Sequence, residues 1–318
     1  MTQPLDVLTL GEAMVAFHGD GAWSEGGRAT TRLAGAESNV AIGLARLGHR
    51  VSWAGRVGAD PFGELVLRQL RAEGVQVDHA RRDATRPTGL MFTERRTADL
   101  LRVEYRRDHS AAAAMAPADV DAALAGGARI LHLTGITAAL SPTARETALH
   151  AARVARAAGA VVSLDVNHRS RLWSRETARE ALVPLAEIVD VVVASDDELD
   201  LVADADADEG EAVALLLNHG ASHVAVKRGA LGASLWTGGH RYDVPAVPVT
   251  AVDPLGAGDA FSAGLLSGML DGLPAQQCLE RGALLGAFAV SSHGDWQGLP
   301  RREELHLLDG LRPGSPLR

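Results

Sequence analysis

The chain has 318 residues, of which 47% are hydrophobic, and this is enough material for a large buried core. Its formal net charge of −9, with lysines and arginines scattered along the chain, argues against nucleic acid as the main partner. The single cysteine, Cys278, excludes a disulfide framework and a Cys-rich metal site, and without an apolar run of about 20 residues we expect a cytoplasmic chain that does not enter a membrane.

Short apolar runs alternate with amphipathic segments along the chain. Strands are expected at 6–12, 50–55, 128–135, 159–167, 189–195 and 222–229. Helices are expected at 37–48, 60–74, 141–159, 174–188 and 209–220. Asp60 and Pro61 are typical of the N-cap and first turn of a helix. Because the strands are continuous apolar runs, they are typical of strands buried on both faces. The alternation therefore predicts an α/β fold, a mostly parallel sheet with helices on both faces.

Two segments, about 13–33 and 86–107, lack a helical period and have strand-turn-strand character. Both leave the alternating pattern and then return to it. We interpret them as a small β-sheet that covers the carboxyl edge of the main sheet, where ligands bind in open α/β folds. Two surface hairpins without a role are the alternative.

The stretch 251–272 places bare backbone and a carboxylate before a helix. Gly256, Ala257 and Gly258 expose consecutive N–H groups, and a helix of small residues is expected at 259–270. N–H groups at a helix N-terminus form an anion site. Asp259 would repel an anion there, so it makes sense as a base that takes a proton from a hydroxyl beside a phosphate in transfer. A glycine-rich turn with a structural Asp is the alternative.

Two long motifs carry a family resemblance. "DPLGAGDAFSAG" (253–264) resembles the C-terminal signature of the ribokinase-like (PfkB-type) carbohydrate kinases. "AGAESNVAIGLARLG" (34–48) and "GRVGADPFGELV" (55–66) resemble the N-terminal one, and the similarity runs from about Leu8 to Leu308. The resemblance implies a single domain, 1–318, with a ribokinase-like αβα sandwich and a β lid. It also implies transfer of the ATP γ-phosphate to a sugar hydroxyl, with ATP and Mg²⁺ as cofactors and a monovalent cation as an option.

The same resemblance assigns roles to residues. The catalytic group is Asp259 as general base, with Gly256, Ala257 and Gly258 as the anion hole. The residues expected to hold sugar hydroxyls are Gly35, Asn39 and, from "SSHGDWQGLP" (291–300), Asp295. The residues expected on the nucleotide side are Asn167, Ser195, Lys227, Gly229, Gly232, Gly256 and Gly258. A plain β-hairpin accounts for the glycines of 226–234 nearly as well.

The family's metal-associated motif N-x-x-E reads Ser195-Asp196-Asp197-Glu198 in this chain. Glu198 is retained and is expected to act on Mg²⁺ through water. Serine replaces the asparagine, which leaves the part of Ser195 open.

Two segments bear on the sugar. "LDVNHRSRLW" (164–173) and "VEYRRDHSAAAAMAP" (103–117) resemble segments of 2-keto-3-deoxygluconate kinases. An acid sugar needs a cation, and arginine binds a carboxylate with two parallel hydrogen bonds. We expect Arg107 and Arg169 to do so, with Tyr105 adding a hydroxyl. For Arg95, Arg96 and Arg106 surface ion pairs are the better interpretation.

One departure keeps other substrates open. Met91 stands where ketodeoxygluconate kinases usually have a tyrosine. A fructokinase or another kinase of neutral ketoses or ribose is therefore the main alternative. A nucleoside or vitamin kinase and a sugar-binding regulator without turnover are further alternatives, and Asp259 argues against the last. A β lid also has free edges, so we expect a homodimer through the lid.

Overall fold

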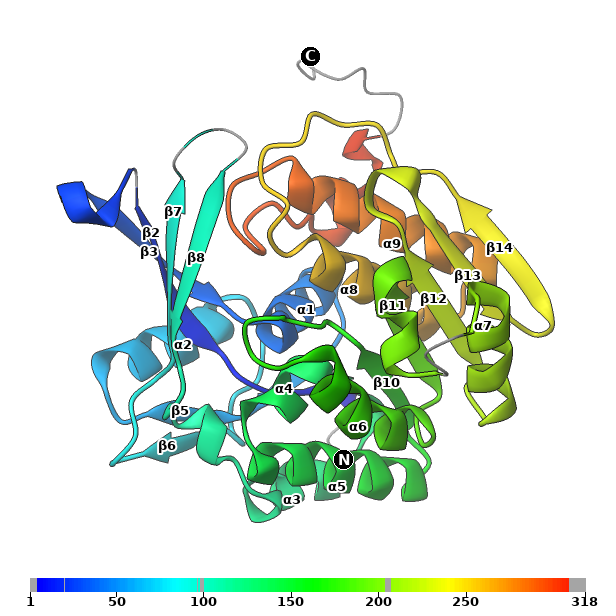
Figure 1. The fold of residues 1–318 in the computed structure, drawn as a ribbon, viewed down its shortest axis with the longest axis horizontal. Coiled ribbons are helices and arrows are strands. Elements are labelled where there is room, and N and C mark those ends of the chain that lie inside the picture. Colours follow the sequence, from blue (N-terminus) through cyan, green and yellow to red (C-terminus); the bar gives the residue numbers. More distant parts are fainter. Residues whose placement is uncertain (1–4, 20, 96, 98–99, 204–206, 309–318) are drawn as a thin grey trace.

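The structure is a computed structural model that describes residues 5–19, 21–95, 97, 100–203 and 207–308. Its main sheet has eight strands in the order β14-β13-β12-β11-β10-β9-β1-β4 (Figure 1). The strands are β1 (Leu5–Leu10), β4 (Val51–Ala54), β9 (Ala128–Thr134), β10 (Val161–Asp165), β11 (Val191–Ser195), β12 (His223–Lys227), β13 (Ala233–Thr237) and β14 (His240–Val244).

The six strands from β4 to β12 run parallel, as the apolar runs predict, and β13 and β14 add two antiparallel strands at one edge. Val191, Val192 and Val193 of β11 are fully buried, which is what a strand covered on both faces requires. The parallel register aligns the carboxyl ends of these strands at one edge of the sheet.

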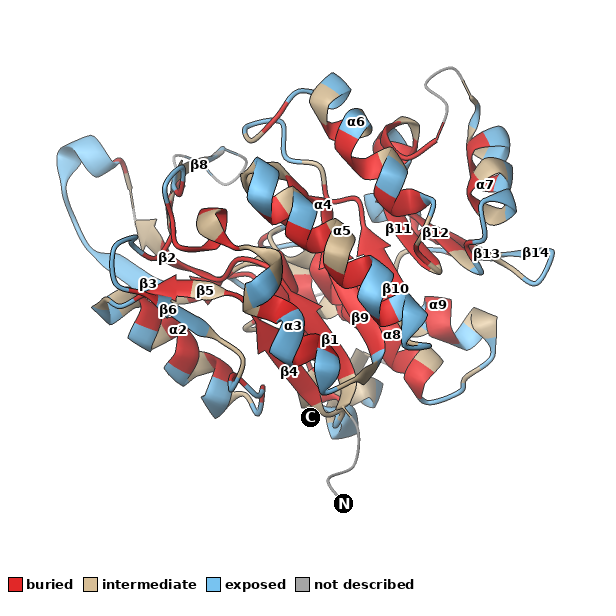
Figure 2. Cartoon of the chain, turned by 90° about the horizontal axis from the view of Figure 1, so that it is seen from below, coloured by how far each residue is buried: buried red, intermediate tan, exposed pale blue. Residues whose placement is uncertain are grey.

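Helices cover both faces, which confirms the predicted αβα sandwich. One apolar layer contains side chains of α1 (Ala36–Arg46), α2 (Pro61–Ala72), α8 (Ala257–Leu270) and α9 (Ala275–Val290). The other contains side chains of α3 (Pro117–Ala125), α4 (Gly135–Leu140), α5 (Pro142–Ala157), α6 (Arg175–Ala186) and α7 (Glu209–Asn218). In Figure 2 these helices turn buried stripes toward the sheet and exposed stripes outward.

Helix caps follow the sequence signals. Asp60 caps α2 by accepting from the backbone N–H of Gly63 at 2.8 Å, and Pro61 is the first residue of the helix. No helix within the described residues is long and apolar enough to span a bilayer.

The segments 13–33 and 86–107 form one separate four-stranded sheet, which we call the lid sheet. Its strands, in the order β3-β2-β7-β8, are β2 (Met14–Gly19), β3 (Ala29–Ala34), β7 (Leu90–Arg95) and β8 (Leu101–Arg106). Residues 20, 96, 98 and 99 of these segments, Arg96 among them, lie outside the described residues. A two-stranded sheet, β5 (Arg56–Gly58) with β6 (Arg81–Asp83), completes the strands described.

Candidate active site

The carboxyl edge of the main sheet and the lid sheet enclose a cavity of about 900 Å³. The main sheet contributes residues at or just beyond the ends of parallel strands, namely Glu12, Asn167, Ser195 and Lys227. The lid contributes Met14, Met91 and Tyr105, followed by Arg107 just after β8. The cavity therefore lies where the sequence predicted a ligand site.

The N-terminus of α8 forms the floor of this cavity. Gly256 is its N-cap with φ of 73°, in the left-handed region, and a side chain there would collide with the carbonyl oxygen of Asp295. The helix begins at Ala257, two residues earlier than expected, because this glycine turn already sets the helical path. The N–H of Ala257 donates to the carbonyl of Pro254 at 3.4 Å, whereas the N–H groups of Gly258 and Asp259 have no partner inside the helix and are available to an anion.

Asp259 lies in the first turn of α8 and is buried. Its carboxylate accepts hydrogen bonds from Asn39 Nδ2 at 2.8 Å and Asn167 Nδ2 at 3.1 Å. Burial raises the pKa of Asp259, against the hydrogen bond from Asn39 and the positive charge of Arg169. A raised pKa makes this carboxylate a better proton acceptor near neutral pH.

Asp295 is a second buried acid that lines the cavity, and its Oδ1 atom has no hydrogen-bond partner among the described residues. Burial and the nearby charge of Asp259 raise the pKa of Asp295 to about 7. Its backbone packs against Gly256, so the loop that carries Asp295 and the α8 turn are in direct contact.

The two arginines predicted to bind an acid sugar both line the cavity, but they differ in their partners. Arg107 is 4% exposed, forms an ion pair with Glu12, and lies 5.3 Å from the centre of the Tyr105 ring. Arg169 is exposed, donates to the carbonyl of His168 at 3.4 Å, and has no carboxylate partner in the described part of the chain. Arg169 is thus the arginine of the two that forms no ion pair within the described residues.

The other predicted sugar residues also lie in the cavity wall. Met91 is buried in a small apolar cluster with Met14 of the lid. Gly35 precedes α1 with φ of 137°, and a side chain there would collide with the carbonyl of Glu12.

Lys227 at the end of β12 also lines the cavity and forms an ion pair with Asp165, at 2.9 Å to Oδ1. Burial acts to lower the pKa of Lys227, but the charges of Asp165 and Glu198 outweigh it, and the pKa lies above its usual value. Gly229 and Gly232 form the turn of the β12–β13 hairpin and also line the cavity. The plain β-hairpin and the turn expected on the nucleotide side are therefore the same segment.

Glu198 follows Ser195 at the end of β11, in a short 3-10 helix, Asp196–Leu201. Its two oxygens accept the backbone N–H groups of His168 at 2.7 Å and Ser195 at 2.8 Å. Among the described residues no cluster of three or more His, Cys, Asp or Glu could hold a metal ion. A single buried carboxylate beside an anion site fits Mg²⁺ that is held mainly by phosphate and water.

Sequence reasoning missed part of the cavity lining. An apolar wall next to the Lys227 side comes from the segment after β14 and from α8 and α9; it includes Ala246, Val247, Pro248, Val249, Phe261, Ala287 and Val290. Two buried acids, Glu12 and Glu37, were also missed. The apolar run 244–249 was a signal for the wall, whereas nothing in the sequence marked the acids.

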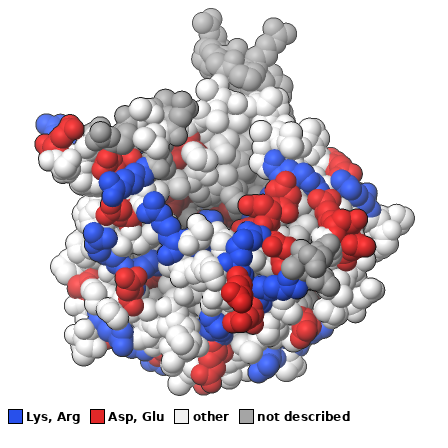
Figure 3. All heavy atoms as spheres, viewed as in Figure 1, with Lys and Arg blue, Asp and Glu red and all other residues white. Residues whose placement is uncertain are grey.

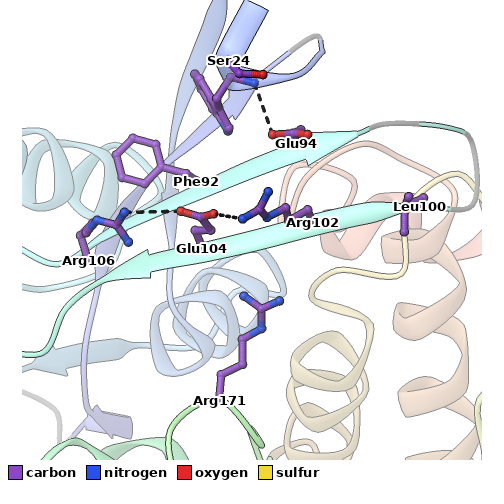
Figure 4. Close-up of a pocket in the computed structure, with 9 residues that line it drawn as sticks. Ser24, Phe92, Glu94, Leu100, Arg102, Glu104, Arg106 and Arg171 are labelled. Atoms are coloured by element: carbon purple, nitrogen blue, oxygen red, sulfur yellow. Dashed lines mark hydrogen bonds and ion pairs between the residues drawn. The ribbon is translucent and has the colours of Figure 1, made fainter.

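A second hollow lies on the lid sheet, lined by Trp23, Phe92 and charged residues of β8 (Figure 4). There Glu104 pairs with Arg102 at 2.6 Å and with Arg106 at 3.4 Å, so Arg106 has the surface ion pair expected of it. Arg171 points from the loop after β10 toward β8 and donates to the carbonyl of Val103. Figure 3 shows charges of both signs intermingled on this face of the molecule.

Three comparisons with known proteins bear on this site. The family model for pfkB family carbohydrate kinases matches residues 5–302. The chain is 38% identical over 306 residues to a 2-dehydro-3-deoxygluconokinase of Bacillus subtilis, covering 95% of this chain and 94% of that protein. It is 34% identical over 298 residues to a 2-dehydro-3-deoxygalactonokinase of Haloferax volcanii, covering 91% and 92%. The crystal structure of a putative ribokinase II of E. coli with ATP and Mg²⁺ superposes with a TM-score of 0.89 at 26% identity, over 96% of this chain and 98% of that one.

Proposed function

The chain belongs to the pfkB family of carbohydrate kinases, as an ATP-dependent enzyme, and from that premise we propose that its acceptor is 2-keto-3-deoxygluconate. The observation that carries this proposal is the pair of arginines, Arg107 and Arg169, in one cavity with Asp259. A keto-deoxy acid has both a hydroxyl for phosphorylation and a carboxylate for these cations.

In the proposed reaction Asp259 takes the proton of the acceptor hydroxyl as that oxygen attacks the γ-phosphorus of ATP. The bond between the γ-phosphorus and the bridging oxygen breaks at the same time, and ADP leaves with the electron pair of that bond. The amide groups of Asn39 and Asn167 hold the carboxylate in place by donating to it. The N–H groups at the start of α8, from the Gly256-Ala257-Gly258 turn, stabilise the negative charge on the transferred phosphoryl group.

The acceptor lies between the lid sheet and α1. Arg169 supplies the charge for its carboxylate, because no acid of the described chain neutralises this arginine. Arg107 and Tyr105 add donors from the lid side. Gly35, Asn39 and Asp295 are left for the sugar hydroxyls.

ATP lies on the Lys227 side of the cavity, with its base against the apolar wall at 246–249. Lys227, Gly229 and Gly232 border the phosphates, together with Asn167 and Ser195. Mg²⁺ would neutralise phosphate charge, and Glu198 is the residue that would help to hold it, through water. The ATP and Mg²⁺ present in the superposable E. coli structure support this assignment.

2-Keto-3-deoxygalactonate is the second candidate, because the Haloferax relative is named for it. The two acids differ in the configuration of one carbon, so the cation requirement is the same for both. Fructose or another neutral ketose is the third candidate, since Met91 gives the lid one hydroxyl fewer than expected.

A coupled ADP-release assay with ketodeoxygluconate, ketodeoxygalactonate, fructose and ribose tests the proposal. We expect kcat/KM to be highest for ketodeoxygluconate and at least about tenfold lower for the two neutral sugars. A preference for fructose or ribose contradicts the acid-sugar assignment. Absence of ADP release with every sugar favours a binding protein without turnover.

We also propose a homodimer through the lid. Strands β3 and β8 are the edges of the lid sheet, and unpaired edges favour pairing with another strand. Light scattering of the purified protein at micromolar concentration tests this, and a mass of one chain overturns it.

A further inference from the structure

Glu12 is a fully buried acid two residues beyond the end of β1. Two glycines leave room for it. A side chain at Gly89, just before β7, would collide with its Oε1 atom, and one at Gly35, before α1, would collide with its carbonyl. Glu12 is therefore enclosed where β1, the lid sheet and α1 meet at the cavity.

The carboxylate of Glu12 holds the segment that follows β8. Its Oε1 atom accepts a hydrogen bond from Ser110 Oγ at 2.7 Å, and its Oε2 atom forms the ion pair with the Arg107 guanidinium. On its other side that guanidinium lies against the ring of Tyr105. The Nε atom of Arg107 is buried without a hydrogen-bond partner among the described residues. Arg107 thus lines the cavity and also has a buried donor that no protein group in the described residues uses.

The pairing also changes what Arg107 can offer. A buried carboxylate without a cation is costly, so Glu12 depends on Arg107 as much as Arg107 depends on Glu12. Because the two charges cancel, Arg107 offers a ligand N–H donors with a fixed direction and little net charge. Arg169 forms no such ion pair with any acid of the described residues, although its charge acts on Asp259 and Asp295 from farther away.

Resting on the proposed function, we propose that Glu12 is a positioning residue of the sugar site, which aims the free donors of Arg107 at the acceptor. Glu12 acts through Arg107 and does not itself touch the sugar. Arg107 then selects an acceptor by the position of its oxygen atoms, and Arg169 selects it by charge.

A double-mutant cycle in kinetics tests this role. We expect Glu12→Gln to raise KM for ketodeoxygluconate about tenfold or more, with KM for ATP unchanged, because the guanidinium loses its fixed orientation. Arg107→Gln should give a similar increase. The double variant Glu12→Gln/Arg107→Gln should be no worse than Arg107→Gln alone, within about twofold, since the two residues act as one unit. Glu64→Gln, which breaks the exposed pair with Arg82, is the matched control and should leave both KM values unchanged.

Thermal unfolding separates positioning from loss of structure. Each single variant leaves one buried charge unpaired and should lower Tm, whereas the double variant should recover part of that loss. If Glu12→Gln fails to fold, Ser110→Ala removes the neighbouring hydrogen bond without exposing a charge and should still raise KM for the sugar alone, by about two- to threefold.

The role of Glu12 is overturned if the KM for the sugar in the double variant rises by the product of the two single increases. It is also overturned if a single substitution raises KM for the sugar and for ATP equally. These outcomes are distinct from failure of the proposed function. If the wild-type enzyme prefers fructose, the acid-sugar assignment fails whatever the cycle shows. If it prefers ketodeoxygluconate and the two substitutions act independently, only the role of Glu12 fails.

Discussion

The acidic residues at the two ends of the cavity, which we assign to the sugar and to the nucleotide, have different kinds of partner. At the sugar end, Asp259 and Asp295 are buried without an ion-pair partner in the described chain, and amide groups are the donors to Asp259. At the nucleotide end, Asp165 is paired with Lys227, and Glu198 accepts two backbone N–H groups.

This difference matches the chemistry that we propose for each end. A residue that accepts a proton must change its charge at modest cost, and a salt bridge would fix that charge. A residue that frames phosphates and metal needs a constant charge. The raised pKa values of Asp259 and Asp295 follow from the first arrangement.

The largest expected effect tests the acid at the centre of this comparison. Asp259→Asn keeps the shape of the side chain but cannot accept a proton, so kcat should fall by about 10²- to 10⁴-fold. ATP binding, measured by calorimetry, should persist because the nucleotide end is intact. Turnover close to that of the wild type removes Asp259 from the role of base.

The next effect concerns the arginine that forms no ion pair within the described residues. Arg169→Ala should lower kcat/KM for the acid sugar by the equivalent of roughly 2–4 kcal/mol, as expected when the sugar carboxylate, sequestered in the cavity, loses its partner. A neutral ketose should lose much less, and Arg169→Lys should restore little, because an ammonium cannot form the bidentate pair. Equal losses for both kinds of sugar would indicate damage to the fold instead.

A smaller effect follows from the pKa of Asp295, which burial raises from its usual value of 3.8 to about 7. Native Asp295 keeps a proton that the unfolded chain releases, so the wild type should lose stability as pH rises from about 4 through about 7. Asp295→Asn removes this loss. The Tm of this variant should therefore rise relative to that of the wild type between about pH 4 and about pH 7. A constant Tm difference over this range argues against a titrating Asp295.

The smallest effect concerns the motion of the walls. If the lid sheet closes on the sugar, ketodeoxygluconate should slow amide exchange in 13–33 and 86–107. The β12–β13 hairpin should respond to ATP instead, since it borders the nucleotide end. Exchange in the lid that is equal with and without sugar argues against a closing lid.

The sequence predicted the features that depend on local pattern. The parallel strands, the separate lid sheet and the helix that begins near Asp259 follow from periodicity and turn chemistry, and the structure confirms them. The roles proposed for individual cavity residues stay predictions that the experiments above address.

Features that depend on tertiary contacts could not be predicted. In the sequence Glu12 resembles any acidic residue that follows a strand. Its ion-pair partner, Arg107, lies 95 positions later in the chain, so only the folded structure reveals the pair. The apolar run at 244–249 was a signal in the sequence, but nothing in it indicated that residues 246–249 line the same cavity as residues of α8 and α9. For Asn167 the sequence predicted a place beside the phosphates, which stays a prediction, and gave no sign of its hydrogen bond to Asp259.

The contact between Gly256 and Asp295 also limits how the substrate of this enzyme can be changed. The loop with Asp295 rests directly on the turn that we propose holds the transferred phosphate, with no room for even a methyl group between them. Redesign of that loop for a new sugar would therefore shift the phosphate-binding turn and reduce turnover for every substrate. The lid side, where Met91 and Tyr105 line the cavity, is free of this constraint. New acceptor preferences, by natural divergence or in the laboratory, should therefore arise first in β7 and β8.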